Sequence, residues 1–183
     1  MSPVTHQYVT RLGRDFFSRD VLTVAPEFIG KILVRRDGSI LDRYTIIEAE
    51  AYRGEEDEAS HARFGRTARN SVMYGRGGLV YVYLIYGMYW MLNVVTGPEE
   101  IPQAILIRGL SGHGGPGILT RALGIDRSFY GEDLVTSDRL WMEDSSFHPP
   151  VVRKPRVGIT YAGEPWKSTT WRFMAALPAC PEP

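Results

Sequence analysis

The uncharged run at residues 77–98 constrains the fold of this chain more than any other feature. Its 22 residues are close to the roughly 20 apolar residues that a helix needs to cross a bilayer. However, tyrosines recur along the whole run instead of gathering at its ends, and Gly87 interrupts its centre. We therefore reject a membrane span and predict two strands, about 79–85 and 89–96, joined by a tight turn at 86–88.

The length of the chain and the order of its expected elements indicate a single α+β domain. A chain of 183 residues has the size of one ordinary domain. Hairpin-connected strands dominate the pattern, and short helices are expected mainly at 20–30 and 116–124. Because strands and helices do not alternate regularly, we expect one domain over 1–183 with a mostly antiparallel sheet and short peripheral helices. Its ends, about 1–10 and 177–183, are expected to be flexible.

The strand pattern also predicts several finer features. A β-hairpin is expected around a turn at 37–38. Period-two alternation puts Glu48 and Glu50 on one face of its second strand. Ile47 and Ala49 lie on the other face. The core-facing positions of the first aromatic strand are expected to be Val80, Val82 and Leu84. Further strands are expected at 103–109, 139–143, 156–160 and 171–175, and residues 53–78 should be mostly loop.

The formal net charge is zero, but the charges are unevenly distributed along the chain. Between residues 59 and 125 the only acids are Glu99 and Glu100. The same stretch carries six arginines, Arg63, Arg66, Arg69, Arg76, Arg108 and Arg121. A second basic group near the C-terminus comprises Arg153, Lys154, Arg156, Lys167 and Arg172. The pattern fits either one basic surface or two ordinary solvated faces, and composition leaves both open.

The familiar signatures of several enzyme classes are absent. The chain has no GxxxxGK[ST] phosphate loop, no HExxH, no paired CxxC and no GxSxG. Its four histidines are scattered, and the single cysteine, Cys180, allows neither a disulfide framework nor a thiolate metal cluster. The first 20 residues carry charges and no apolar segment, so we expect a cytoplasmic protein, associated with the nucleoid if bacterial.

The segment EAEAYRGEEDEASH holds the strongest candidates for chemistry. A carboxylate that leaves a buried strand for a cleft, such as Glu50, is a good candidate general base, because partial burial raises its proton affinity. Taken singly, Glu50 could instead pair with an arginine, Tyr52 and Tyr83 could be core aromatics, and His61 could cap backbone groups. Combined with Tyr86 on a hairpin tip and an arginine-rich loop, they could stack a base while holding phosphates.

Six longer segments form a recognisable set along about residues 11–173. They read FIGKILVRR, IIEAEAYRGEEDEASH, YVYLIYGMYWMLNVVTGP, AILIRGL, GPGILTRALGI and PRVGI. The EAEAY block with its following histidine and the YVYLIYGMYWMLN block are both long and specific. With them, the chain resembles the alkyladenine DNA glycosylase family, also called 3-methyladenine or methylpurine-DNA glycosylases.

The resemblance implies roles for residues around a pocket. Glu50 would be the catalytic general base, and Arg108 would lie beside the catalytic water. Tyr52, His61 and Tyr83 would wall the pocket for an extruded base.

The resemblance also implies how the protein meets DNA. Tyr86 would fill the gap that the extruded nucleotide leaves, with Gly87 and Met88 completing the DNA-contacting turn. Asn93 would occupy the position that clashes with the 2-amino group of a normal guanine. The charge pattern adds candidate contacts to the DNA backbone, which are Arg63, Arg66 and Arg69.

The implied activity is release of damaged purines from double-stranded DNA, leaving an abasic site for base excision repair. The lesions would be 3-methyladenine and 7-methylguanine, and in addition ethenoadenine and hypoxanthine. The family fold is a single mixed domain with a curved antiparallel sheet, and it needs no metal or organic cofactor. A glycosylase that also nicks DNA needs an amine nucleophile. The three lysines, Lys31, Lys154 and Lys167, lie outside the pocket motifs, so we expect a monofunctional enzyme. We also expect it to act as a monomer.

Two alternatives and one departure from the family pattern remain. The same residues suit a nucleic-acid-binding module without catalysis, or a hydrolase of free nucleosides, which has no use for the arginine loop or Tyr86. The departure is the connection after the Arg108 strand, where only SGHG separates Leu110 from Gly115. The family has a longer, helix-forming connection there, so its absence favours a more open groove and a different lesion range.

Overall fold

The computed structural model describes residues 10–176 of the chain. The predicted flexible ends fall almost wholly outside the described residues, as does Cys180. The helical elements are α1 (Arg14–Phe17), α2 (Val21–Phe28), η1 (Ser71–Tyr74), α3 (Pro116–Ala122) and η2 (Arg127–Phe129). The strands are β1 (Ile32–Asp37), β2 (Ile40–Arg53), β3 (Val80–Ile85), β4 (Tyr89–Val95), β5 (Gln103–Leu110), β6 (His113–Gly114), β7 (Leu140–Glu143), β8 (Val151–Lys154) and β9 (Arg172–Ala175).

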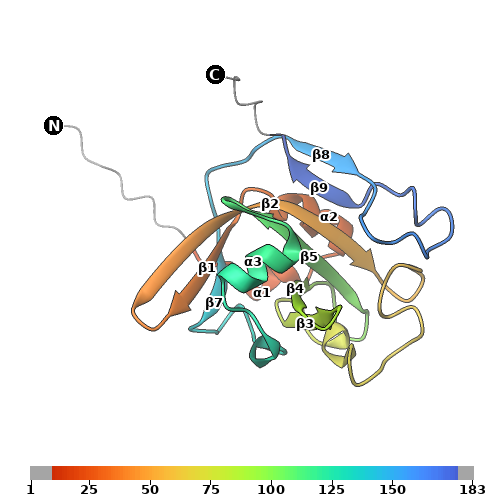
Figure 1. Cartoon of the computed structure of the whole chain (residues 1–183), viewed down its shortest axis with the longest axis horizontal. Helices are drawn as coiled ribbons and strands as arrows, with labels where there is room; N and C mark the ends of the chain where they lie inside the picture. Colours follow the sequence, from red (N-terminus) through yellow and green to blue (C-terminus); the bar gives the residue numbers. More distant parts are fainter. Residues whose placement is uncertain (1–9, 177–183) are drawn as a thin grey trace.

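The strands form a curved antiparallel sheet with short helices around it (Figure 1). Among the described residues this sheet has nine strands, and its main path runs β3-β4-β5-β2-β1-β7. Strand β6 pairs with β5, and β9 joins β2 to β8. The prediction of a single α+β domain with a curved, mostly antiparallel sheet and short peripheral helices is confirmed.

Strand β2 connects the two halves of the sheet, because its fourteen residues pair with β1, β5 and β9. Glu48 and Glu50 share a face, as predicted, since both approach Arg108. The prediction that Ile47 shares a face with Ala49 is wrong. The pairing with β5 is irregular on both sides of Glu48, and this bulge carries Ile46 instead of Ile47 into the core.

One hairpin turn and one expected strand also differ from the prediction. The first hairpin turn lies one residue later than expected, at Gly38 and Ser39. Gly38 has φ +57°, a left-handed conformation that a residue without Cβ adopts at no steric cost. The expected strand at 156–160 is wrong, because β8 ends before Pro155, whose nitrogen has no hydrogen to donate to a sheet.

Strands β3 and β4 form the hairpin predicted from the uncharged run, with its tip at 86–88. Tyr86 and Gly87 have φ of 53° and 68°, the positive values that tight hairpin turns favour. The two valines of β3 are buried as expected, but Leu84 is 40% exposed, because this end of the strand extends beyond the core. No helix in the described part of the chain is long and apolar enough to cross a membrane.

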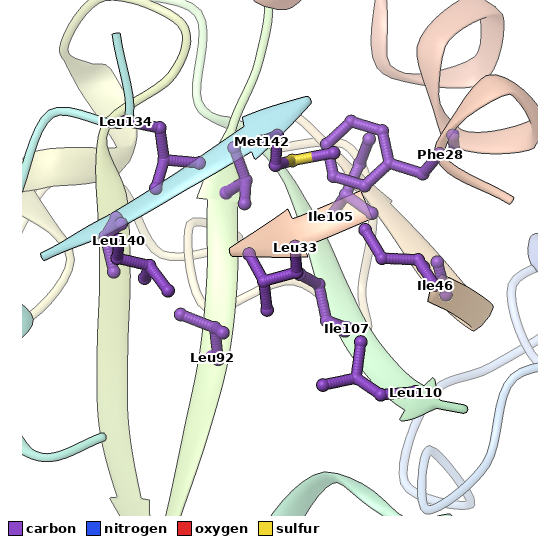
Figure 2. Close-up of a cluster of buried hydrophobic side chains, with 14 of the residues drawn as sticks. Phe28, Leu33, Ile46, Leu92, Ile105, Ile107, Leu110, Leu134, Leu140 and Met142 are labelled. Carbon is purple, nitrogen blue, oxygen red and sulfur yellow. The ribbon is translucent and has the colours of Figure 1, made fainter. Parts of the chain in front are cut away.

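One large hydrophobic core holds the sheet and its helices together. Figure 2 shows Phe28 of α2 beside Met142 of β7, with Leu33 of β1 and Ile107 of β5 below them. All four side chains are fully buried. Burying each such side chain stabilises the fold by about 1.5–3 kcal/mol. The core therefore fixes β2 and β5, which carry the charged residues described next.

Candidate active site

A pocket opens between the aromatic hairpin, the ends of β2 and β5, and the segment at 157–161. Its volume is about 350 Å³, at the small end of the about 300–1,000 Å³ that small-molecule sites occupy. The predicted site residues that line it are Tyr52, His61, Arg69, Tyr83, Tyr86, Asn93 and Arg108. Within residues 10–176, no group of three or more histidine, cysteine, aspartate or glutamate side chains is arranged to hold a metal ion.

Glu50 lies directly behind the wall of this pocket and has no exposed surface. Its Oε1 accepts a hydrogen bond from the backbone N–H of Val157 at 2.8 Å, and its Oε2 accepts one from the Tyr52 hydroxyl at 2.9 Å. Arg108 Nε lies 3.4 Å from Oε1. All three partners line the pocket, so the carboxylate is one layer deeper than the cleft position expected from the sequence.

The surroundings of Glu50 suit a proton acceptor. Burial raises the pKa of Glu50 above its ordinary value, while Arg108 and the N–H of Val157 limit the rise. Glu48, for which no role was predicted, accepts a hydrogen bond from Arg108 Nε at 3.0 Å. The guanidinium of Arg108 is thus fixed between two carboxylates. Its positive charge stabilises the ionised form of Glu50, while burial keeps the pKa of Glu50 above its ordinary value.

Aromatic rings form the sides of the pocket. The rings of His61 and Tyr83 meet edge to face with centroids 4.4 Å apart, and Tyr81 and Tyr83 are 5.4 Å apart. Burial raises the pKa of Tyr52, and it raises the pKa of Tyr83 to about 12. Both hydroxyls are therefore neutral at physiological pH, and the rings offer flat faces on which a base can stack.

His61 is held as a neutral imidazole. Burial, together with the charges of Arg69 and Arg63, lowers the pKa of His61 to about 4. Its Nδ1 lies 2.8 Å from the hydroxyl of Tyr81, which is only 1% exposed. No role was predicted for Tyr81 from the sequence, although its position two residues before Tyr83 places both on one face of β3.

Asn93 is fixed at the edge of the pocket by the hairpin itself. It is 3% exposed and lies opposite Tyr81 in the β3–β4 register. Its Nδ2 donates hydrogen bonds to the carbonyl oxygens of Tyr81 at 3.1 Å and Met91 at 3.3 Å. These two bonds hold the amide in one place, so a ligand that approaches it meets a side chain that does not swing aside.

A model of the methylpurine-DNA glycosylase family matches residues 15–113 and 111–178 of the chain. The chain belongs to this family. The resemblance drawn from the sequence is therefore confirmed, and the protein is an enzyme of the DNA glycosylase class. The two matched stretches of the glycosylase overlap at 111–113, within the connection that is short in this sequence.

Curated relatives of the glycosylase share most of its length and are provisionally named 3-methyladenine DNA glycosylases. The relative from Anaeromyxobacter sp. (strain Fw109-5) is 46% identical over 174 residues, covering 89% of this chain and 88% of its own. The relative from Methanocella arvoryzae is 42% identical over 180 residues, covering 85% and 90%. The relative from Legionella pneumophila (strain Corby) is 42% identical over 171 residues, covering 89% and 93%.

The arginines of the central loop take different positions in the glycosylase. Arg69 lines the pocket. The guanidinium of Arg63 lies 4.6 Å from the ring of Phe64, which is 84% exposed. Arg66 forms an exposed ion pair with Glu100 at 2.9 Å. Arg63 and Arg66 therefore lie outside the pocket, while Arg69 belongs to its wall.

The second basic group does not form one surface. Arg156 is buried and makes an ion pair with the equally buried Asp57. Arg172 Nη1 lies 3.5 Å from Glu48, inside the same network that holds Arg108. Part of the charge pattern seen in the sequence thus reflects internal ion pairs, and only the remainder is available to a partner.

Proposed function

We propose that this glycosylase hydrolyses the N-glycosidic bond of alkylated purines in duplex DNA and leaves an abasic site. The observation that carries the proposal is the burial of Glu50 behind a pocket of aromatic rings, where three pocket-lining residues bind its carboxylate. A carboxylate with a raised pKa accepts a proton from water more readily than an exposed one does. This arrangement supports catalysis over simple binding.

The glycosidic bond of a stacked purine is out of reach, so the nucleotide must first rotate out of the duplex, at a cost of a few kcal/mol. We propose that Tyr86, which is 81% exposed at the hairpin tip, occupies the gap with Gly87 and Met88 beside it. The extruded base would stack on Tyr52 and Tyr83, each base–ring stack contributing about 1–3 kcal/mol.

In the chemical step, Glu50 takes a proton from a water molecule beside Arg108 while the water oxygen forms a bond to C1′ of the sugar. The bond between C1′ and the base nitrogen breaks, and its electron pair leaves with the base. A purine alkylated at N3 or N7 carries a positive charge, so it departs as a neutral molecule and needs no acid. Glu50 also stabilises the oxocarbenium-like transition state, as carboxylates do in glycoside hydrolysis.

Selectivity follows from the fixed side chain of Asn93. Its amide is held by two backbone carbonyl oxygens, so the 2-amino group of any guanine would meet a side chain that cannot move. 7-Methylguanine keeps this group, and its release relies on the positive charge that weakens its glycosidic bond. We propose 3-methyladenine and 7-methylguanine as the main substrates, with ethenoadenine and hypoxanthine as further ones. The enzyme would act as a monomer, because it grips a single nucleotide.

Cleavage of the DNA strand is not part of the proposed reaction. A lyase step needs an amine that forms a Schiff base with the sugar. None of the described residues that line the pocket is a lysine, and Lys31 is engaged with Asp144 at 2.6 Å. The product should therefore be an intact strand with an abasic site.

The experiment is base release from duplexes that each carry one of the four lesions, followed by electrophoresis without alkali. We expect released base and unbroken strands. Strand breaks that appear as fast as free base would contradict the hydrolytic mechanism. Equal activity on free nucleosides would support a nucleoside hydrolase, and a Glu50→Gln variant with unchanged turnover would leave Glu50 without a catalytic role.

A further inference from the structure

A buried ion pair lies behind one of the aromatic walls. Arg156 and Asp57 have completely buried side chains and are joined by two hydrogen bonds, from Nη1 at 2.6 Å and from Nη2 at 2.8 Å. Arg156 Nη1 also donates to the carbonyl oxygen of Ala51 at 2.9 Å. Neither residue lines the pocket, and neither has a role in the reaction described above.

The guanidinium of Arg156 is in contact with two aromatic rings. Its central carbon lies 4.8 Å from the centroid of Tyr52 and 5.1 Å from that of Trp171. Arg156 therefore covers one face of Tyr52, and a base that stacks on Tyr52 must use the opposite face. A positive charge and the extruded base thus share a single ring.

Because Arg156 and the base share the Tyr52 ring, the charge of Asp57 affects how strongly a cationic base binds there. A ring attracts a cation through the negative charge of its π face, and a second cation across the ring opposes that attraction. The base would lie roughly 9 Å from the guanidinium, given usual stacking distances, and an unpaired charge at that range changes affinity on the order of tenfold. Asp57 cancels the charge of Arg156 at a contact distance of 2.6 Å.

We propose that Asp57 is a specificity-determining residue that acts through Arg156 and Tyr52, favouring positively charged lesions over neutral ones. The inference rests on the proposed function, since it concerns the bases which that function releases. Asp57 also holds the adjoining loop, because its carboxylate accepts hydrogen bonds from the backbone N–H groups of Arg53 at 3.1 Å and Ala59 at 3.0 Å. A purely structural role would slow the release of every lesion alike.

The test measures one ratio, kcat/KM on a 7-methylguanine duplex divided by kcat/KM on a neutral lesion. The neutral lesion is hypoxanthine or ethenoadenine, whichever the unchanged enzyme releases faster. Both duplexes are assayed in the same enzyme sample, so the folded fraction cancels from the ratio. Asp57→Asn leaves Arg156 positive and should lower the ratio on the order of tenfold. Arg156→Gln removes the cation, while the Asp57 carboxylate keeps the hydrogen bonds from the N–H groups of Arg53 and Ala59 that favour its charged form, so this variant should raise the ratio.

The double variant Asp57→Asn with Arg156→Gln restores a neutral pair, and its ratio should return to that of the unchanged enzyme. Replacing both members of a buried pair is better tolerated than removing one. If Asp57→Asn does not fold, Arg156→Gln alone decides, because a structural role predicts no rise. Ratios that stay constant while all rates fall would overturn the role of Asp57 and leave the proposed function intact. If the unchanged enzyme released neither 7-methylguanine nor the neutral lesion, both the role of Asp57 and the proposed function would be overturned.

Discussion

The wall behind the pocket and the tip of the β3–β4 hairpin are built in opposite ways. Glu50 is fully buried, and both of its carboxylate oxygens have hydrogen-bond donors within 2.9 Å. Tyr86 and Met88 are 81% and 63% exposed. The positive φ of Tyr86 belongs to a tight turn that projects beyond the core.

The contrast separates two tasks that a glycosylase must perform. Burial raises the proton affinity of the Glu50 carboxylate, which is useful for chemistry and of no use for reaching into a duplex. An exposed aromatic tip has no raised proton affinity, and in the proposed function it is the part that reaches into the duplex. We therefore expect changes in the wall to alter the rate of base release, and changes at the tip to alter the capture of the lesion.

The largest effect is expected for Glu50→Gln. Glutamine keeps the shape of the side chain but cannot take the proton, so base release should fall about 10²- to 10⁴-fold. Single-turnover release from a 7-methylguanine duplex measures this change. Glu48→Gln is the matched control, because Glu48 also contacts Arg108 but lacks the hydrogen bonds from Tyr52 and Val157. A larger loss of base release in Glu48→Gln would show that Glu48, and not Glu50, is the general base.

Tyr86→Ser should weaken binding to lesion duplex roughly tenfold, in line with the 1–3 kcal/mol of a base–aromatic stack. Thermal unfolding should change little, because most of the Tyr86 side chain is exposed. Fluorescence anisotropy gives the affinity, and Tyr86→Phe is the control that keeps the ring. A matching loss of Tm in Tyr86→Ser would mean that the tip supports the fold instead of the DNA complex.

The pH profile should report Glu50 and not His61. Glu50 works as a carboxylate and its pKa is raised, so kcat/KM on a cationic lesion should fall about tenfold for each pH unit below that pKa. The pKa of His61 is lowered to about 4, so this imidazole is already neutral where the fall begins. His61→Gln should lower the rate without moving the midpoint. A midpoint that moves with His61→Gln would make the histidine the titrating group.

The smallest effect concerns salt. Each phosphate that an arginine neutralises adds about 0.9 to the slope of log affinity against log salt concentration. Arg63→Ala and Arg66→Ala should each reduce the slope by about that amount. Arg43→Ala is the control, because Arg43 pairs with Glu143 at the other end of the sheet. Equal slopes for all of these variants would remove Arg63 and Arg66 from the DNA interface.

Local signals in the sequence were sufficient for much of the fold. The aromatic hairpin followed from the spacing of its tyrosines around Gly87, and helix α2 starts at its predicted cap, where Asp20 accepts a hydrogen bond from the N–H of Leu22 at 2.9 Å. Most pocket-lining residues lie in the segments that resemble the family, and Arg69, Met73 and Tyr161 lie outside them. The hairpin turn and the helix cap depend on residues that are close together along the chain.

Contacts between distant segments were beyond the sequence. The pair Asp57 and Arg156 joins residues 99 positions apart, and nothing in the local pattern distinguishes Arg156 from the exposed Arg153 nearby. The bulge beside Glu48 shifts the alternation by one residue, and its cause is the pairing with β5. The depth of Glu50 has the same origin, because the segment carrying Val157 covers it.

The most direct measurement compares Glu50→Gln and Tyr86→Ser on one 7-methylguanine duplex, recording both the dissociation constant and the single-turnover rate at saturation. We predict that Glu50→Gln keeps its affinity and loses its rate. We predict that Tyr86→Ser loses affinity and approaches the unchanged rate once saturated. Loss of affinity and rate in equal measure by both variants would contradict the division of tasks between wall and tip.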